Sequence, residues 1–306
     1  MSLLSKLKRK GPSGFGYGST AEDVTEGLNL SGKTFVLTGC NSGLGLETLR
    51  VLGKRGAHII ALARSEKKAS TALKTSKTHG TPLACELSEP FSVRQCIQDI
   101  KAKGKTIDAI LCNAGIMALP KLKLAHGYEL QFLTNHIGHY GLVRGLVDAL
   151  AEDGRVVVTS STAHKRAPDC TIDFDNLDGH KSYTPWESYG QSKIANILFA
   201  YHLNKTFEGT QRRAYSLHPG VIDTNLTRHM PTLLKNAWSV MGPLVLKSIP
   251  EGAATQCYVA TQPGLEDLGG QYFADCNVAK TREDAMNATI AKRLWTLSDE
   301  IFSSIG

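Results

Sequence analysis

The sequence has no run approaching the ~18 consecutive apolar residues that a transmembrane helix needs, so it predicts no membrane span. Its opening residues also lack the long apolar stretch and the small-residue cleavage site of a secretory signal. The seven cysteines are odd in number and irregularly spaced, and no C-x-x-C pair occurs among them. This pattern indicates small buried side chains rather than a disulfide framework, and it favours the reducing cytoplasm.

Positive charge is in modest excess. Lysine and arginine number 35 against 28 acidic residues, which gives a formal charge of +7. No basic stripe alternates with aromatic residues and no zinc-finger spacing occurs, which argues against a nucleic-acid partner. Much of the excess falls on Lys6, Lys8, Arg9 and Lys10. A solvated terminus is the favoured interpretation of this short segment, and weak peripheral contact with an anionic membrane surface is the alternative.

What the sequence does contain is an alternation of short β-branched runs with amphipathic segments. Expected strands cover residues 33–38, 58–63, 82–87, 107–113, 155–161, 214–220 and 270–276. Expected helices cover 44–56, a polar stretch ending near 77, 91–103, 128–151 and 187–207. This alternation predicts an α/β fold, namely a single-domain Rossmann-type doubly wound parallel sheet of about seven strands with helices on both faces. Residues 1–30 are expected to form an arm before a domain at 31–306.

A glycine-rich stretch, T-G-C-N-S-G-L-G, follows the first expected strand and opens the first helix. Gly39, Gly43 and Gly45 permit a tight turn, close approach of the backbone to a pyrophosphate, and packing of the helix on the strand. The helix N-terminus adds N–H groups that favour phosphate. A glycine cluster alone is often only a turn. At the first strand–helix junction of this alternation, however, it favours a dinucleotide.

The end of the second expected strand favours NADP(H) over NAD(H). An acidic residue about 20 positions after the glycine loop would bind a ribose 2′-hydroxyl, whereas a basic residue would accept a 2′-phosphate. The chain has Arg64 at this turn and no acid before Glu66. A guanidinium grips phosphate with its fork of donors, and an arginine at a helix start gains nothing from the helix dipole. A surface arginine without a ligand is the alternative.

Tyr189 and Lys193 stand four positions apart in ESYGQSKIAN and would share one face of a helix. The charge of the lysine would lower the pKa of the phenol, and the pair could then act as a general acid/base unit. Such pairs also arise on ordinary helix surfaces, so the spacing alone is a weak signal.

A set of motifs in one order makes the pattern specific. They are T-G-C-N-S-G-L-G (38–45), N-A-G (113–115), T-N-H-I-G-H (134–139), S-S-T-A-H (160–164), Y-G-Q-S-K (189–193) and H-P-G-V-I-D-T (218–224). On these motifs the chain resembles the short-chain dehydrogenase/reductase superfamily over residues 30–280, and within it the retinol-dehydrogenase-like branch. The resemblance implies an oxidoreductase that interconverts an alcohol and its carbonyl compound.

The resemblance also implies roles for particular residues. Tyr189 would be the general acid/base, and Ser161 would bind the substrate oxygen. Lys193 would bind the nicotinamide ribose and lower the pKa of the tyrosine, while Asn135 would hold a water that links Lys193 to solvent. The implied cofactor contacts are Gly39, Asn41, Ser42, Gly43, Leu44, Gly45, Arg64, Glu86, Leu87, Asn113, Ala114, Gly115, Tyr189, Lys193, Pro219, Gly220, Val221, Ile222 and Thr224.

Two features depart from the usual family pattern. Glu86 stands where relatives have aspartate after the third strand, and the longer acid could still reach the adenine amino group. Residues 162–188 connect Ser161 to Tyr189 by a longer path than is usual in the superfamily. We expect this connection to lie beside the mouth of the site.

The apolar segment 225–248 has two interpretations. It is either an amphipathic helix that closes the core or a lid over a hydrophobic substrate, as in the family. The expected substrate contacts are Met117, His164, Leu226, Met230 and Trp238, with a purely structural role as an equal alternative for His164. His136 and His139 form H-x-x-H without a third ligand at useful spacing, so we expect structural histidines and no metal site.

The predicted function is thus an NADP(H)-dependent oxidoreductase acting on a hydrophobic small molecule, with retinoids, steroids, aldehydes, ketones and secondary metabolites all open. A non-catalytic NADP-sensing scaffold on the same fold is the alternative. Presence of all four implied catalytic residues favours catalysis. The oligomeric state is open, and residues 128–152 and 187–207 are where relatives of this fold pair.

Overall fold

The computed structural model describes residues 9–222 and 246–305. One predicted cofactor residue and three predicted substrate residues lie outside these ranges: Thr224, Leu226, Met230 and Trp238. The same holds for most of the expected lid at 225–248.

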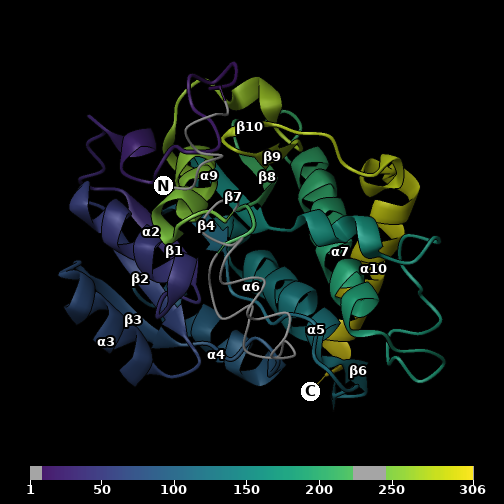
Figure 1. The fold of residues 1–306 in the computed structure, drawn as a ribbon. Coiled ribbons are helices and arrows are strands. Elements are labelled where there is room, and N and C mark those ends of the chain that lie inside the picture. The colour runs from purple at the N-terminus through teal and green to yellow at the C-terminus, as the bar shows by residue number, and fades with distance from the viewer. Residues whose placement is uncertain (1–8, 223–245, 306) are drawn as a thin grey trace, which may run out of the picture.

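The core of the fold is an eight-stranded sheet with the order β10-β9-β8-β7-β4-β1-β2-β3 (Figure 1). All neighbouring pairs are parallel except β9 and β10. The strands are β1 (Thr34–Thr38), β2 (His58–Ala63), β3 (Gly80–Ala84), β4 (Ile107–Cys112), β7 (Leu150–Thr159), β8 (Arg213–His218), β9 (Tyr272–Ala274) and β10 (Asn277–Val278). The predicted single-domain, doubly wound α/β sheet is confirmed.

Helices cover both faces of the sheet because its strands are apolar on both sides. Phe35 and Leu37 of β1 pack in one core with α2, α3 and α9, whereas Val36 between them packs in the other with α4, α6 and α7. The long C-terminal helix α10 lies outside α6 and α7 (Figure 1). The helices are α2 (Gly43–Lys54), α3 (Glu66–Ser76), α4 (Pro90–Lys101), α6 (Gly138–Leu146), α7 (Pro185–Thr206), α9 (Ile249–Thr261) and α10 (Ala288–Ser304).

The third strand is shifted relative to its prediction. It spans Gly80–Ala84 rather than residues 82–87, and it contains Pro82. Proline cannot donate a ladder hydrogen bond, and β3 tolerates it because this strand lies at the edge of the sheet and pairs only with β2. Residues 85–87 of the expected strand therefore form a loop after β3, and this loop contains Glu86 and Leu87.

The segment 128–151 is not the single helix that its periodicity predicts. A two-stranded ladder of β5 (Leu124–Ala125) and β6 (Tyr128–Glu129) precedes a short α5 (Leu130–Phe132), and a π-helical stretch, η2 (Leu133–Ile137), then leads into α6. After α6 come the 3₁₀ turn η3 (Val147–Ala149) and an early start of β7. Hydrophobic periodicity does not detect this break, because one wide turn leaves the apolar face nearly unchanged.

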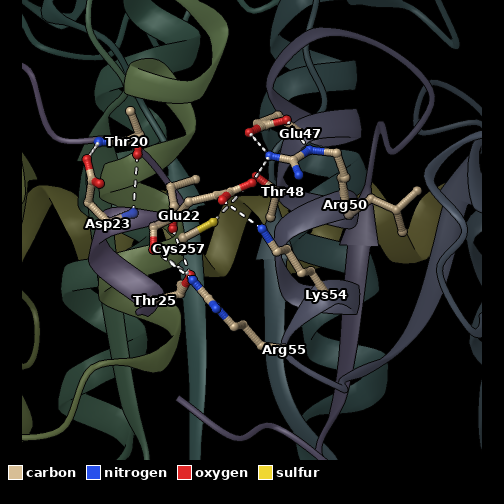
Figure 2. Close-up of polar contacts among 12 residues, drawn as sticks. Thr20, Glu22, Asp23, Thr25, Glu47, Thr48, Arg50, Lys54, Arg55 and Cys257 are labelled. Carbon is tan, nitrogen blue, oxygen red and sulfur yellow. Dashed lines mark hydrogen bonds and ion pairs between the residues drawn. The ribbon is translucent and has the colours of Figure 1, made fainter. Parts of the chain in front are cut away.

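The described part of the expected arm, residues 9–30, packs on α2 and α9. Ala21 and Val24 are fully buried in the same core as these helices. Figure 2 shows the polar side of this contact, where Glu22 pairs with Arg50 and Lys54 of α2. The arm is thus part of the folded unit. Within the described residues, no helix has the length and apolar character required to cross a bilayer.

Candidate active site

The strand order reverses between β1 and β4, the point where open α/β sheets bind ligands at the carboxyl ends of their strands. β1 ends at Thr38 and runs into the glycine loop, and β4 ends at Cys112 and runs into Asn113–Gly115. The two motifs predicted to bind the cofactor therefore meet at one end of two paired strands.

The glycine loop leaves no room for side chains where it faces this second motif. Gly39 has φ +67°, and a Cβ on it would lie 3.0 Å from the Cα of Ala114. A Cβ on Gly45 would lie 2.1 Å from the carbonyl oxygen of Gly39 and 2.7 Å from the Nδ2 of Asn113. Ser42, the N-cap of α2, makes no side-chain capping bond, so its hydroxyl does not compete for the N–H groups of the first turn. The two glycines therefore let the loop pack closely on the N-A-G motif.

Thr38 joins these two motifs through one hydroxyl. Its Oγ1 accepts the backbone N–H groups of Asn113, at 2.9 Å, and Ala114, at 3.0 Å. The Asn113 side chain returns the contact, because its Nδ2 donates to the carbonyl oxygen of Thr38 at 2.8 Å. The ends of β1 and β4 are thereby locked together below the glycine loop.

His139 extends this lock to α6. Its Nδ1 lies 2.9 Å from the carbonyl oxygen of Asn135, and its Nε2 lies 2.9 Å from the Oγ1 of Thr38. A carbonyl oxygen only accepts, so Nδ1 carries the proton and Nε2 accepts the proton of the Thr38 hydroxyl. Burial lowers the pKa of His139 to about 4, which keeps this tautomer neutral at physiological pH.

Asn135 lies in the π-helical stretch and is fully buried. Its Nδ2 donates to the carbonyl oxygen of Ile116 and to the Oγ of Ser192, each at 2.9 Å. Its Oδ1 accepts the N–H of Ile116 at 2.8 Å. The side chain thus fastens the segment after the N-A-G motif to α7, as π turns at functional sites often do. The water expected at Asn135 stays a prediction.

Helix α7 carries Tyr189 and Lys193 on the face that meets β7. The Nζ of Lys193 donates to the carbonyl oxygen of Thr159 at 3.1 Å and lies 5.6 Å from the centre of the Tyr189 ring. Gly190 permits this close approach, because a Cβ there would lie 2.7 Å from both the Ala163 oxygen and the Ala167 nitrogen. Both predicted catalytic side chains on α7 therefore face the end of β7.

Ser161 completes this group directly after β7. It is the N-cap of η4 (Thr162–Arg166), and its Oγ accepts the N–H of Ala163 at 3.1 Å. Its hydroxyl also forms a hydrogen bond with Tyr189, which partly counters the effect of burial on the pKa of that phenol. The structure thus brings together the four residues of the predicted tetrad, Asn135, Ser161, Tyr189 and Lys193.

The electrostatics of the pair are dominated by burial. Burial raises the pKa of Tyr189 to about 12 and lowers the pKa of Lys193 to about 8. Both shifts favour the neutral forms. The predicted lowering of the phenol pKa by Lys193 is therefore not visible in the protein alone.

The loop after β8 approaches the glycine loop through α9. Pro219 is buried, Gly220 has φ +100°, and Val221 is exposed. A Cβ on Gly252 of α9 would lie 2.6 Å from Ile222 and 2.8 Å from Leu44 of the glycine loop. Both predicted cofactor segments therefore pack on one glycine.

Three predicted cofactor contacts lie at the ends of β2 and β3. Arg64 is exposed directly after β2. Glu86 accepts hydrogen bonds from the N–H and the hydroxyl of Ser88, at 3.3 Å and 3.0 Å. Leu87 is buried, and its carbonyl oxygen lies only 2.2 Å from where a Cβ on Gly138 would be. Of the three, only Arg64 has a polar side chain for which the described structure shows no hydrogen bond.

The two described residues predicted to contact substrate differ in exposure. Met117 is exposed. His164 is fully buried, with Nδ1 2.6 Å from the Ser161 carbonyl oxygen and Nε2 accepting the Arg282 N–H at 3.3 Å. With both ring nitrogens bonded to backbone, the geometry favours the structural alternative for His164.

His136 and His139 are both used for packing and hydrogen bonds. The Nε2 of His136 lies 2.8 Å from the Oγ of Ser298 on α10, and burial lowers the pKa of its ring. Across residues 9–222 and 246–305, no group of three or more His, Cys, Asp or Glu side chains is arranged to hold a metal ion.

Sequence reasoning gave no role to Thr38 or Trp186, and both take part in the site together with His139. Thr38 and His139 form the lock beneath it, and Trp186 lies beside Tyr189 with ring centres 6.1 Å apart. Thr38 could have been identified from the sequence, because it places a hydroxyl group at the end of an apolar strand. Trp186 lies three positions before Tyr189 on the first turn of α7, so its helical spacing could have suggested that it neighbours the tyrosine.

Comparison with known proteins agrees with this geometry. A family model described as short chain dehydrogenase matches residues 33–173. The chain is 39% identical to short-chain dehydrogenase TIC 32 A, chloroplastic, of Brassica napus, over 97% of each chain. It is 35% identical to retinol dehydrogenase 11 of Homo sapiens, over 90% of this chain and 88% of that one.

Solved structures share the fold. A crystal structure of a protein from Mycobacterium paratuberculosis matches with a TM-score of 0.74 at 30% identity, over 92% of this chain and 97% of that one. A short chain dehydrogenase from Burkholderia cenocepacia, solved in complex with NADP, matches with a TM-score of 0.64 at 21% identity, over 80% of this chain and 96% of that one.

Proposed function

Because the chain belongs to the short-chain dehydrogenase family of oxidoreductases, we propose that it interconverts an alcohol and its carbonyl compound with NADP(H). The proposed substrate is a hydrophobic small molecule, and the proposed general acid/base is Tyr189. The observation that carries the proposal is the convergence of Ser161, Tyr189 and Lys193 next to the glycine loop and its partner motif.

The described residues fit a dinucleotide. Gly39 and Gly45 let the loop lie against Asn113 and Ala114, where any Cβ would collide, and α2 presents its first turn beside this loop. This loop would hold the pyrophosphate, and Lys193 would hold the nicotinamide ribose. When bound, the cofactor supplies or accepts the hydride. The protein supplies position, a proton and exclusion of water.

Tyr189 would exchange the proton at the substrate oxygen, with Ser161 donating a hydrogen bond to the same oxygen. The pKa of about 12 suits the tyrosine as an acid in reduction, since it stays protonated at neutral pH. Oxidation needs the phenolate, and a positive charge near the ring must then offset burial. Lys193 with its proton retained, together with an oxidised nicotinamide, would provide that charge.

Arg64 supports NADP(H) over NAD(H). It is exposed at the end of β2, and β2 is paired with β1, which carries the glycine loop. A guanidinium there would meet the 2′-phosphate, and no acidic residue precedes Glu66 at this turn.

A hydrophobic substrate is supported by exposed apolar side chains at the same end of the sheet. Met117 follows the segment that Asn135 holds, Val221 lies in the loop after β8, and Trp186 neighbours Tyr189. The guanidinium of Arg166 lies 4.9 Å from the Trp186 ring and helps to hold it. Retinol, named for one relative, belongs to this substrate class.

The test is a panel of hydrophobic aldehydes and ketones assayed with NADPH and with NADH, for the wild type and Tyr189→Phe. We expect NADPH-dependent reduction that falls by at least about 10²-fold in the variant, with NADPH binding retained. Turnover that survives the loss of the phenol would exclude Tyr189 as the general acid/base. Tight NADPH binding without turnover across the panel would favour the non-catalytic sensor instead.

We also propose a cytoplasmic protein, because all seven cysteines are free thiols and six of them are buried. Contact of the basic opening segment with a membrane surface and formation of a homo-oligomer stay predictions. Residues 1–8 lie outside the described structure.

A further inference from the structure

A buried lysine lies beside the loop that follows β8. Lys247 is only 1% exposed, and its Nζ lies 2.7 Å from the Oδ1 of Asp275. The same ammonium lies 4.7 Å from the ring centre of Tyr17, a residue of the arm. Taking an ammonium group out of water is costly unless it is paired. A leucine or methionine would fill the space more cheaply, so the charge at this position calls for an explanation.

The main chain of Lys247 is bonded to the loop. Its N–H donates to the carbonyl oxygen of Val221 at 2.9 Å, and the residue forms a parallel bridge with Ile222. The side-chain stem crosses the preceding residue, since a Cβ on Gly220 would lie 2.5 Å from the Cδ of Lys247. Lys247 thus contacts three consecutive residues of a segment predicted to bind the cofactor.

The partner of the lysine lies in the two-residue turn of a β-hairpin. Asp275 and Cys276, between β9 and β10, both have positive φ, +52° and +62°. Positive φ at both central residues is what a two-residue turn between antiparallel strands requires. The Oγ1 of Thr255 accepts the Cys276 N–H at 3.2 Å, and the Nδ2 of Asn277 donates to the Asp275 carbonyl oxygen at 2.7 Å. The turn that carries the Asp275 carboxylate is therefore fixed by bonds to Thr255 of α9 and Asn277 of β10.

The arm is bonded to this same turn. The side chain of Asn277 accepts the Ser13 N–H at 3.0 Å and donates to the Phe15 carbonyl oxygen at 3.1 Å. The Phe15 ring packs edge-on against Tyr258 of α9, with ring centres 5.7 Å apart. The arm, the β9–β10 turn and Lys247 therefore form one contact group behind the loop.

We propose that Lys247 is a positioning residue for cofactor binding: its ion pair with Asp275, covered by Tyr17 of the arm, holds Gly220–Ile222 in the conformation that meets the nicotinamide end of the cofactor. The arm would then contribute to the cofactor site through its contacts with Lys247 and the β9–β10 turn. This inference rests on the proposed function, because it assumes that the loop after β8 binds NADP(H). A loop held in place before binding loses less conformational entropy when the ligand arrives.

The experiment measures NADPH affinity and stability separately in the ligand-free protein. NADPH dissociation constants are determined by fluorescence titration, and thermal midpoints are determined without ligand. The variants are Lys247→Met, Asp275→Asn, their double variant and Tyr17→Leu. Lys280→Met, which removes an exposed lysine after β10, is the matched control.

We expect Lys247→Met and Asp275→Asn each to weaken NADPH binding about tenfold, and the double variant to weaken it no further, because the two groups act as one pair. Tyr17→Leu should weaken binding by a smaller factor, about threefold, and Lys280→Met should not change it. A purely structural role would lower the thermal midpoint and leave the dissociation constant unchanged.

The outcomes separate this inference from the proposed function. Wild-type NADPH affinity in folded Asp275→Asn and Tyr17→Leu overturns the positioning role while the proposed function stands. These two variants decide the question even where Lys247→Met does not fold. A wild type that binds neither NADPH nor NADH overturns both proposals.

Discussion

Gly190 of α7 and Ala163 of η4 approach so closely that a Cβ on the glycine would lie 2.7 Å from the alanine carbonyl oxygen. This contact brings Tyr189, the neighbour of Gly190, to Ser161 at the end of β7. The glycine inside Y-G-Q-S-K is therefore a steric requirement of the site, although a glycine inside a helix costs about 1 kcal/mol relative to alanine.

We predict that Gly190→Ala lowers the free energy of unfolding by about 1–3 kcal/mol and reduces kcat by about tenfold or more. The added methyl group must push α7 away from η4 and with it the phenol of Tyr189. Urea unfolding and steady-state kinetics measure the two effects.

The matched control is Gly141→Ala on α6, where a Cβ would lie 2.2 Å from the Phe302 ring. This variant should lose stability and keep its kcat, because the strain falls away from Tyr189. Equal losses of kcat in both variants would mean that general destabilisation, not the position of the tyrosine, accounts for the effect.

The sequence predicted the parts of the site that depend on local chemistry. Gly39 and Gly45 are needed because one loop must turn tightly, and a loop of this kind is visible in a short stretch of sequence. Tyr189 and Lys193 share a helix face at a spacing that any helix would give. The parallel sheet followed from alternating apolar runs, and in such a sheet ligands bind at the carboxyl ends of the strands.

Contacts between distant segments could not be predicted in this way. The bond between His139 and Thr38 joins residues 101 positions apart, and the spacing of H-x-x-H gives no sign of it. The ion pair of Lys247 and Asp275 depends on a turn with two positive φ values in residues that are not glycine. The strand β10 has two residues, too few to show a pattern of alternation.

Thr38 provides a second prediction, since one hydroxyl serves two backbone N–H groups and His139. Thr38→Val keeps the shape of the side chain and removes its hydrogen bonds to all three partners. We expect a loss of about 3 kcal/mol in the free energy of unfolding, together with weaker NADPH binding. Thr38→Ser keeps the hydroxyl and should lose much less. Chemical unfolding of both variants is the measurement, and equal stability of valine and wild type would contradict the lock.

Trp186 provides a prediction about substrate preference. Trp186→Ala should raise KM about tenfold for large apolar aldehydes and ketones, while kcat/KM for a small aldehyde changes little, because only large substrates would reach the indole. The NADPH dissociation constant should stay at the wild-type value.

The comparison variant is Arg166→Met, which keeps the indole but removes the guanidinium over its ring. It should show the same selectivity change at a smaller size. If kcat/KM instead fell equally for small and large carbonyl compounds, Trp186 would not recognise the substrate. Its role would then be limited to its contact with Tyr189.

The last prediction concerns Lys193 and pH. Burial lowers its pKa from 10.5 to about 8, so between these values the folded protein binds fewer protons than the unfolded chain. The free energy of unfolding should therefore rise with pH from about 8 to 10, and below pH 8 the buried charge should cost the fold its full penalty. Lys193→Met removes that penalty. At pH 7 we expect the variant to be more stable than wild type by about 2 kcal/mol, within the limit of ~1.4 kcal/mol per pKa unit, while kcat falls at least about 10²-fold.

The stability advantage of Lys193→Met should shrink at pH 10, where the wild-type amine is already neutral in the folded state. Lys205→Met, which alters an exposed lysine on the same helix, should show no such pH dependence. The measurement is urea unfolding of wild type and both variants at pH 7 and pH 10. If Lys193→Met is less stable than wild type at pH 7, the hydrogen bond of the ammonium group to Thr159 stabilises the fold by more than the burial of its charge destabilises it.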